Sequence, residues 1–113
     1  MLARRHRLPA AEIPTVLKQG RKITLPQVLL IFRQTQNPVS RFAFVVPTKV
    51  DKRATVRNRL KRLLREAVQH LLPQIEAGRD ILIIVKKDFS NLTQIEVERL
   101  VKNILFQSGG LRG

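Results

Sequence analysis

The sequence contains no cysteine, tryptophan or tyrosine, and only five phenylalanines. Without cysteine the chain can form no disulfide, thiolate nucleophile or cysteine-ligated zinc site, a composition typical of a reducing compartment. No apolar run reaches the roughly 18 residues that a membrane-spanning helix needs, and the first residues lack the apolar segment of a signal peptide. We therefore expect a cytoplasmic protein with an aliphatic core and no membrane partner.

Acidic residues are also scarce. The 113 residues include 22 lysines and arginines but only eight aspartates and glutamates, which gives a net charge of +14. Such an excess of one sign destabilises the compact state by self-repulsion, and a polyanionic partner relieves it. Nucleic acid is the favoured partner, with an anionic membrane or a merely soluble basic surface as alternatives. The 43% of hydrophobic residues suffices for one domain spanning residues 1–113.

Local patterns predict the order of the structural elements. Helices are expected at 10–19 (ended by Gly20), 54–72 and from Thr93 onward, and strands at 22–24, 27–34, 41–50 and 80–87. We expect an α/β (α+β) fold of order αβββαβα, a two-layer sandwich of helices over a sheet.

The boundaries between these elements carry further signals. The loop containing Asn37 and Pro38 predicts an antiparallel hairpin between 27–34 and 41–50, and Pro47 ends the second strand or confines it to an edge. Thr93 and Glu96 have the spacing of a capping box. We expect the last few residues to be flexible.

The segment RATVRNRLKRLLREA (53–67) is the most informative stretch. As a helix, it places its apolar residues on one stripe, and its basic residues on the opposite side and the two flanks. Glu66 is the only acid between Lys52 and Leu72. Like charges four residues apart cost about 0.2–0.5 kcal/mol per pair, and an ordinary solvated helix mixes the two signs. The pattern favours a polyanion-binding face over a solvated one.

The sequence offers no enzyme site of its own. His6 and His70 have no acidic or thiol partners at ligand spacing, and Asp80 and Asp88 flank a predicted strand as turn residues would. Gly-rich phosphate loops, H-E-x-x-H and nucleophile elbows are absent. We predict no catalytic residue, metal ligand or cofactor bound by the chain itself, so any catalysis in which it takes part is supplied elsewhere.

Taken together, these features resemble the protein subunit of bacterial ribonuclease P. The resemblance rests on RATVRNRLKRLLRE (53–66), which is similar to that family's Arg-Asn-Arg signature helix. RHRL (5–8), RFAFVVPTKV (41–50) and GRDILIIVKK (78–87) support it in matching order. The resemblance implies a basic protein that binds one catalytic RNA and assists removal of the 5′ leader from precursor tRNA. It implies that the RNA supplies the active site and Mg²⁺, and that the fold has a left-handed βαβ crossover.

The resemblance also implies site residues. Those expected to contact the catalytic RNA are Lys49, Lys52, Arg53, Arg57, Asn58, Arg59, Lys61, Arg62 and Arg65, with Arg5, His6 and Arg7 as candidates for additional contacts. A cleft between the first helix and the sheet would hold the leader.

The family commonly has aromatic residues in that cleft. This chain has Ile13, Leu17 and Ile31 there, with Phe44 or Phe32 as substitutes for the missing rings. Two alternatives to the ribonuclease P reading are a noncatalytic ribosomal or chaperone-like RNA-binding protein and a DNA-binding regulator with its basic helix in a major groove.

Overall fold

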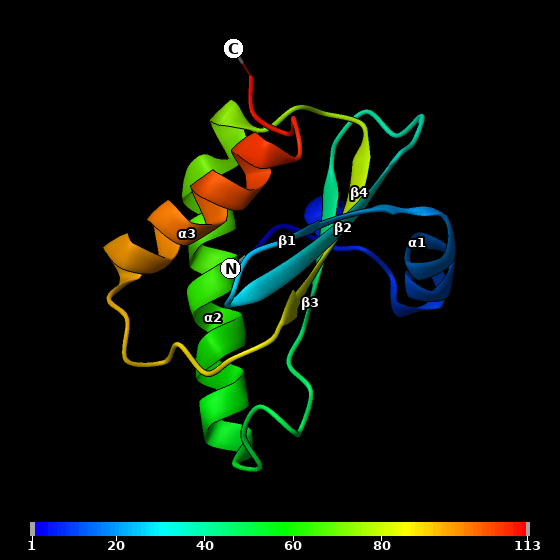
Figure 1. The fold of residues 1–113 in the computed structure, drawn as a ribbon. Coiled ribbons are helices and arrows are strands. Elements are labelled where there is room, and N and C mark those ends of the chain that lie inside the picture. The colour runs from blue at the N-terminus through cyan, green and yellow to red at the C-terminus, as the bar shows by residue number, and fades with distance from the viewer. Residues whose placement is uncertain (1, 113) are drawn as a thin grey trace.

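The computed structural model describes residues 2–112 and has a mixed α/β fold (Figure 1). The main elements are α1 (Ile13–Gln19), β1 (Arg21–Thr24), β2 (Val28–Gln34), β3 (Arg41–Val45), α2 (Ala54–Leu71), β4 (Arg79–Val85) and α3 (Gln94–Gln107). Short 3-10 turns lie at Arg4–His6, Ala10–Glu12 and Leu72–Gln74. The predicted αβββαβα order is confirmed.

The four strands form one sheet in the order β1-β2-β4-β3. β2 pairs antiparallel with β1 and β4, whereas β3 runs parallel to β4. The predicted hairpin between 27–34 and 41–50 is therefore wrong, because β4 lies between those two strands and α2 provides the crossover from β3 to β4. β4 lies between β2 and β3 in the sheet. Its residues 80–83 are buried on both faces, as is typical of a continuous apolar strand in the middle of a covered sheet. β3 ends before Pro47 and lies at an edge, as predicted.

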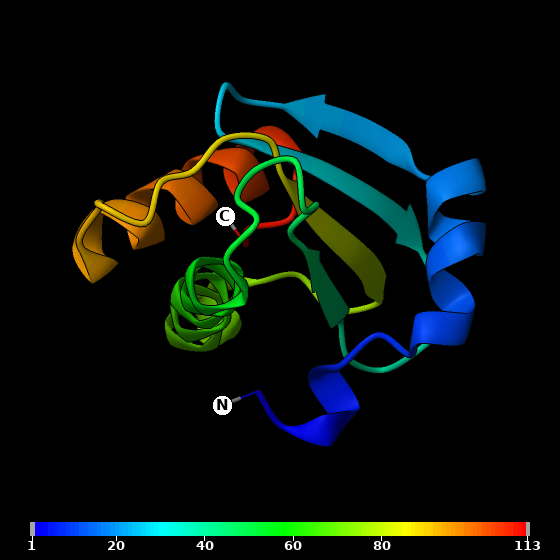
Figure 2. The same ribbon diagram turned by 90° about the horizontal axis from the view of Figure 1, so that it is seen from below.

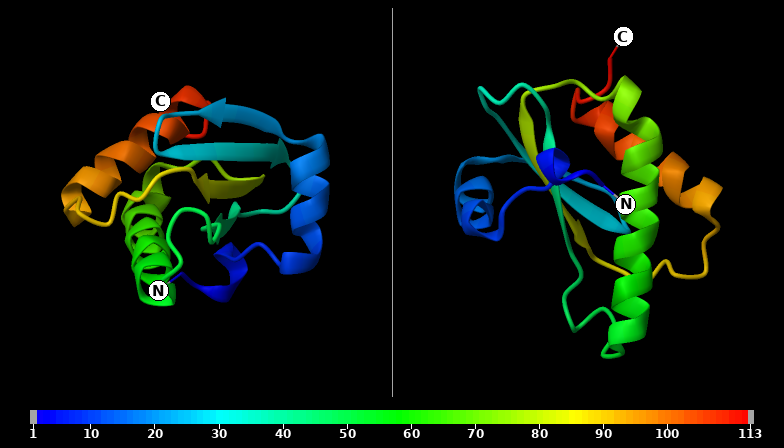
Figure 3. Two further views of the ribbon diagram at one scale, coloured as in Figure 1. Left: turned by 60° about the horizontal axis from the view of Figure 1, so that its bottom comes forward. Right: turned by 180° about the vertical axis from the view of Figure 1, so that it is seen from behind.

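The helices cover both faces of the sheet. α2 and α3 pack side by side on one face and form the second layer of the expected sandwich, while α1 lies across part of the opposite face (Figures 1 and 2). The two views in Figure 3 show the same arrangement. The handedness of the β3–α2–β4 crossover stays a prediction from the resemblance.

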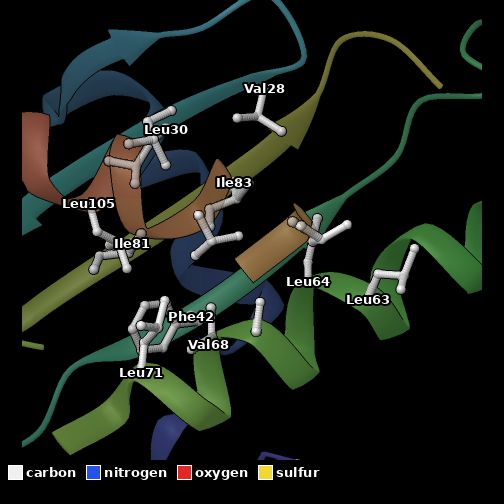
Figure 4. Close-up of a cluster of buried hydrophobic side chains, with 14 of the residues drawn as sticks. Val28, Leu30, Phe42, Leu63, Leu64, Val68, Leu71, Ile81, Ile83 and Leu105 are labelled. Carbon is white, nitrogen blue, oxygen red and sulfur yellow. The ribbon is translucent and has the colours of Figure 1, made fainter. Parts of the chain in front are cut away.

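The larger core fills the space between the sheet and the pair α2 and α3 (Figure 4). Its side chains come from alternate positions of the strands and from the predicted apolar stripe of α2, and include Val28, Leu30, Phe42, Ile81, Ile83, Leu60, Leu63, Leu64, Val68, Leu71 and Leu105. Every residue of that stripe from Leu60 to Leu71 is buried. A smaller cluster under α1 comprises Leu8, Val16, Ile31 and Leu82. The two central strands, β2 and β4, thus bury residues on both of their faces.

Both ends of α3 are fixed by hydrogen bonds. The Thr93 hydroxyl accepts from the Glu96 amide at 3.2 Å, and the Glu96 carboxylate accepts from the Thr93 amide at 2.9 Å, which confirms the capping box. After α3, the Glu76 amide donates to the Gly110 carbonyl at 2.7 Å, and the Arg112 amide donates to the Gln74 carbonyl at 2.7 Å. The described C-terminal residues are thus hydrogen-bonded to the turn after α2. The expected flexibility of the last few residues stays a prediction. Gly113 lies outside the described residues.

Gly20 joins α1 to β1 at a point where a side chain has no room. A Cβ atom there would lie 2.5 Å from Cγ2 of Ile31 and 2.6 Å from the carbonyl oxygen of Val16. Its φ of −77° is open to any residue, so the glycine is needed for close packing and not for a left-handed turn. This contact sets how closely α1 approaches β2.

We predict that Gly20→Ala lowers the free energy of unfolding by about 1–3 kcal/mol, because the added methyl group must push α1 away from Ile31. Urea denaturation checks this, with Gln19→Ala at the neighbouring exposed position as the control. A Gly20→Ala protein as stable as the control variant would show that α1 is not held at close packing distance.

Candidate nucleic-acid interface

α2 presents its basic residues to the outside because its leucines hold the opposite side against the sheet. Asn58, Arg59 and Arg62 are exposed, and Arg57, Lys61 and Arg65 are half-buried. The structure therefore groups the predicted helix residues on one accessible face. Their contact with RNA stays a prediction.

The loop before α2 is ordered by an acidic residue. Asp51 accepts a hydrogen bond from the Arg53 amide at 2.8 Å and one from the Arg53 guanidinium at 2.9 Å. These bonds, the side-chain one first, lower the pKa of Asp51 to about 2. Lys49 lies just before this pair and Lys52 lies between its two residues, and both lysine side chains are exposed. Within residues 2–112 the side chains of Lys49 and Lys52 make no hydrogen bond or ion pair, whereas Arg53 is partly engaged by Asp51.

Two arginines of the basic face have a structural task that the sequence did not reveal. The Arg57 guanidinium donates to the carbonyl oxygens of Asp51 at 2.9 Å and Lys52 at 2.7 Å. Arg59 donates through Nε to the carbonyl of Ser90 at 3.1 Å, in the loop between β4 and α3. These two side chains brace the loops on either side of α2.

The other three cations of the face are uncommitted. Within residues 2–112, Lys61, Arg62 and Arg65 make no hydrogen bond or ion pair through their side chains. They line a groove of about 690 Å³ between α2, β3 and the N-terminal segment, which we call the β3–α2 groove. Its other lining residues are Leu2, Arg7, Phe42, Phe44 and Glu66.

The N-terminal segment reaches this groove by adding to the free edge of β3. The Leu8 amide donates to the Phe42 carbonyl at 2.8 Å, and Nδ1 of His6 donates to the Ser40 carbonyl at 2.8 Å. Figure 2 shows this segment running beside β3 and back toward α2. Arg7 is thereby brought to the basic face of α2, whereas Arg5 is exposed in the short turn before it.

The residues predicted to form the leader cleft do not all meet. Ile13 is half-buried on α1, and Leu17 on the same helix is 44% exposed. Ile31 lies directly beneath α1 with only 1% of its surface exposed. The two helix residues are thus accessible on α1, whereas Ile31 is buried beneath it. A leader cleft at these residues stays a prediction.

Phe44 and Phe32 lie on the other side of the sheet, so their assignment to the leader cleft is corrected. Both pack against the larger core with α2 and α3. Because side chains alternate along a strand, the neighbours Ala43 and Val45 face α1 instead. No aromatic side chain of the described residues therefore replaces the missing rings of the α1 cleft.

Asp80 is fully buried at the start of β4, and the prediction that it marks a turn is wrong. It accepts hydrogen bonds from Arg33 of β2 at 3.0 Å and from Arg41 of β3 at 2.9 Å. Glu12, just before α1, pairs with Arg41 at 2.9 Å and with Arg33 at 3.3 Å. The hydrogen bonds that Arg41 donates to Asp80, and then to Glu12, raise the pKa of Arg41. This ion cluster fastens the beginning of α1 to three strands.

Two further properties of the described residues concern metal binding and membranes. Within residues 2–112, no three or more acidic or histidine side chains lie close enough together to hold a metal ion. In the same part of the chain, every helix is too short or too polar to cross a bilayer.

The fold and the basic face of α2 define a class of protein. It is a small, strongly basic α/β sandwich with an accessible cationic crossover helix. Residues 2–108 match the family described as Ribonuclease P. The ribonuclease P protein component of Xanthomonas campestris is 34% identical over 101 residues, covering 89% of this chain and 67% of that protein. The chain therefore belongs to the ribonuclease P protein family.

Other relatives agree with this assignment. The ribonuclease P protein component of Synechocystis is 43% identical over 75 residues, which cover 66% of this chain and 60% of that protein. The RNase P protein of Thermotoga maritima has the same fold, with a TM-score of 0.81, 28% identity and coverage of 89% of this chain and 96% of that one. An RNase P protein structure from Staphylococcus aureus, at 20% identity, shares the fold with a TM-score of 0.83 over 93% of this chain and 89% of that chain.

We predict that Asp80→Asn destabilises the fold by about 3–5 kcal/mol, because it leaves two arginines without their buried counter-charge. Asp51→Asn is the matched control, because it makes the same chemical change at an ion pair whose arginine is exposed. We expect a much smaller decrease in the free energy of unfolding for this variant. Thermal and urea unfolding of both variants measure the difference. Equal losses for the two variants would contradict the role given to the buried cluster.

Proposed function

We propose that this chain is the protein subunit of ribonuclease P. In this proposal it binds the catalytic RNA through the outer face of α2 and assists endonucleolytic removal of the 5′ leader from precursor tRNA. The observation that carries the proposal is the set of uncommitted cations Lys61, Arg62 and Arg65. They extend from the braced pair Arg57 and Arg59 on the helix that resembles the family's signature.

Electrostatics support this use of α2. Arginine can hold two phosphate oxygens at once through its planar fork, and bound phosphates relieve the repulsion between neighbouring cations. Braced arginines lose less conformational freedom on binding than free ones, because their side chains are already held in place. Arg57 and Arg59 would thus position the backbone of the RNA, while the freer Lys61 and Arg62 adapt to it.

The leader would lie on the other face of the sheet, beside α1. Leu17 and Ile13 project from α1, and half-buried Leu29, Val45 and Ile84 continue the apolar surface on the sheet. An aliphatic surface cannot stack on bases as an aromatic ring does. Each base stacked on an aromatic ring contributes about 1–3 kcal/mol of binding free energy. Leader binding here would therefore depend on shape and on nearby cations.

The chemistry in this proposal comes from the RNA. The buried acid Asp80 is neutralised by Arg33 and Arg41, so it acts in folding and not as a general base. One protein would bind one RNA in the cytoplasm, and the RNA would supply Mg²⁺ together with the active site. The protein would hold the substrate and the folded RNA.

The direct test adds the protein to its cognate RNase P RNA and a precursor tRNA, at a Mg²⁺ concentration where the RNA alone cleaves slowly. We expect the protein to stimulate cleavage at the correct 5′ position and to cleave nothing without the RNA. Absence of stimulation would contradict the proposal, and would favour a ribosomal or chaperone-like role if the protein still binds RNA. Robust cleavage by the protein alone would contradict the proposal that the RNA supplies the active site.

A matched pair of variants assigns the stimulation to α2. Arg62→Ala removes an exposed, unbonded cation of the face, whereas Arg99→Ala removes an exposed cation of α3. Loss of a charge-assisted phosphate contact should weaken RNA binding by about 10-fold for Arg62→Ala alone. Arg57→Ala is a poorer probe, because it also releases the loop at Asp51 and Lys52. Equal effects of Arg62→Ala and Arg99→Ala would mean that only total charge matters.

A further inference from the structure

The β3–α2 groove differs from the rest of the basic face because it has an apolar floor. Phe42 and Leu2 are buried residues of its lining, and Phe44 is half-buried and also lines it. Phosphates alone would need only the cations on the rim. A floor that includes an aromatic ring suits a flat, apolar group.

The walls of the groove are held in place. On one side, the N-terminal segment is fixed by the bond from Leu8 to Phe42 and by the bond from Nε of Arg7 to the Leu2 carbonyl at 2.9 Å. On the other side, α2 is anchored by its buried leucines. The groove is therefore a preformed feature, which lowers the cost of binding a ligand.

The rim is strongly cationic and largely uncommitted. Arg7, Lys61, Arg62 and Arg65 surround the opening, and Glu66 is the one acid among the lining residues. The last three cations have no side-chain partner within residues 2–112. A ligand that joins a flat base to a negative phosphate matches both the floor and the rim, whereas an acidic peptide matches only the rim.

We propose that the β3–α2 groove binds one unpaired nucleotide of the bound RNA, with its base stacked on Phe44 and its phosphate held by the cationic rim. The volume of about 690 Å³ lies in the range of small-molecule pockets and is large enough for one nucleotide. Single-stranded bases that stack on aromatic side chains are a common mode of RNA recognition. This site lies on the face of the sheet opposite α1. The proposal rests on the proposed function and extends the RNA-binding surface from α2 onto β3.

A first experiment needs no variant and no large RNA. The aromatic resonances of the wild-type protein are followed by NMR during titration with adenosine 5′-monophosphate and, separately, with ribose 5-phosphate. We expect the Phe44 ring signals to move with the nucleotide and not with the sugar phosphate. Equal shifts from both ligands, or none from the nucleotide, would overturn base stacking in the groove.

A second experiment uses a matched pair of phenylalanine variants. Phe44→Leu keeps an apolar side chain but removes the ring, and Phe106→Leu does the same on α3, where Phe106 is 72% exposed. We expect Phe44→Leu to weaken binding to the catalytic RNA about 10-fold and Phe106→Leu to leave it unchanged.

The outcomes separate this site from the proposed function. If Phe44→Leu binds the RNA and stimulates cleavage like the wild type, the nucleotide site is wrong and the subunit role stands. If the wild type neither binds the RNA nor stimulates cleavage, the proposed function fails. In that case both proposals fall, because the nucleotide was assigned to that RNA.

Discussion

The buried carboxylate of Asp80 is the interaction on which the arrangement of this protein depends. It lies in the central strand and binds an arginine from each neighbouring strand, and both arginines reach Glu12 at the start of α1. A lone charge at this position would be very costly, so the cluster forms only when β2, β3 and β4 are correctly paired. The same contacts place α1 on one face of the sheet and leave the other face for α2 and α3.

Several of the few acids of this chain are engaged in contacts within the protein, although among the described residues only Asp80 is a fully buried acid. Asp80 and Glu12 join the strands to α1, and Asp51 orders the loop before α2. The excess positive charge is therefore left at the surface, where the leucine stripe of α2 turns much of it outward. Charge repulsion along α2 is tolerated because the core burial of that helix outweighs it. The result is a cationic face on a rigid support.

Local sequence patterns predicted the elements but not their assembly. The periodicity of α2 and the capping box of α3 depend on residues a few positions apart, so both were predicted with their main contacts. Strand order and the role of Asp80 depend on partners 39 and 47 residues away, for which the sequence holds no local signal. Phe44 was assigned to the wrong face of the sheet. Side chains alternate along a strand, but the sequence does not show which set faces α1 until one residue of the strand is paired with its neighbour on β4.

The central claim is that α2 and the loop before it form a phosphate-binding face. The most direct measurement is the affinity of the protein for its cognate RNase P RNA as a function of salt concentration. With six to ten phosphate contacts, the affinity should fall by about 10³- to 10⁵-fold between about 50 and 200 mM salt. An affinity that stays constant over this range would contradict the account, because it would mean that the cations of α2 do not meet phosphates.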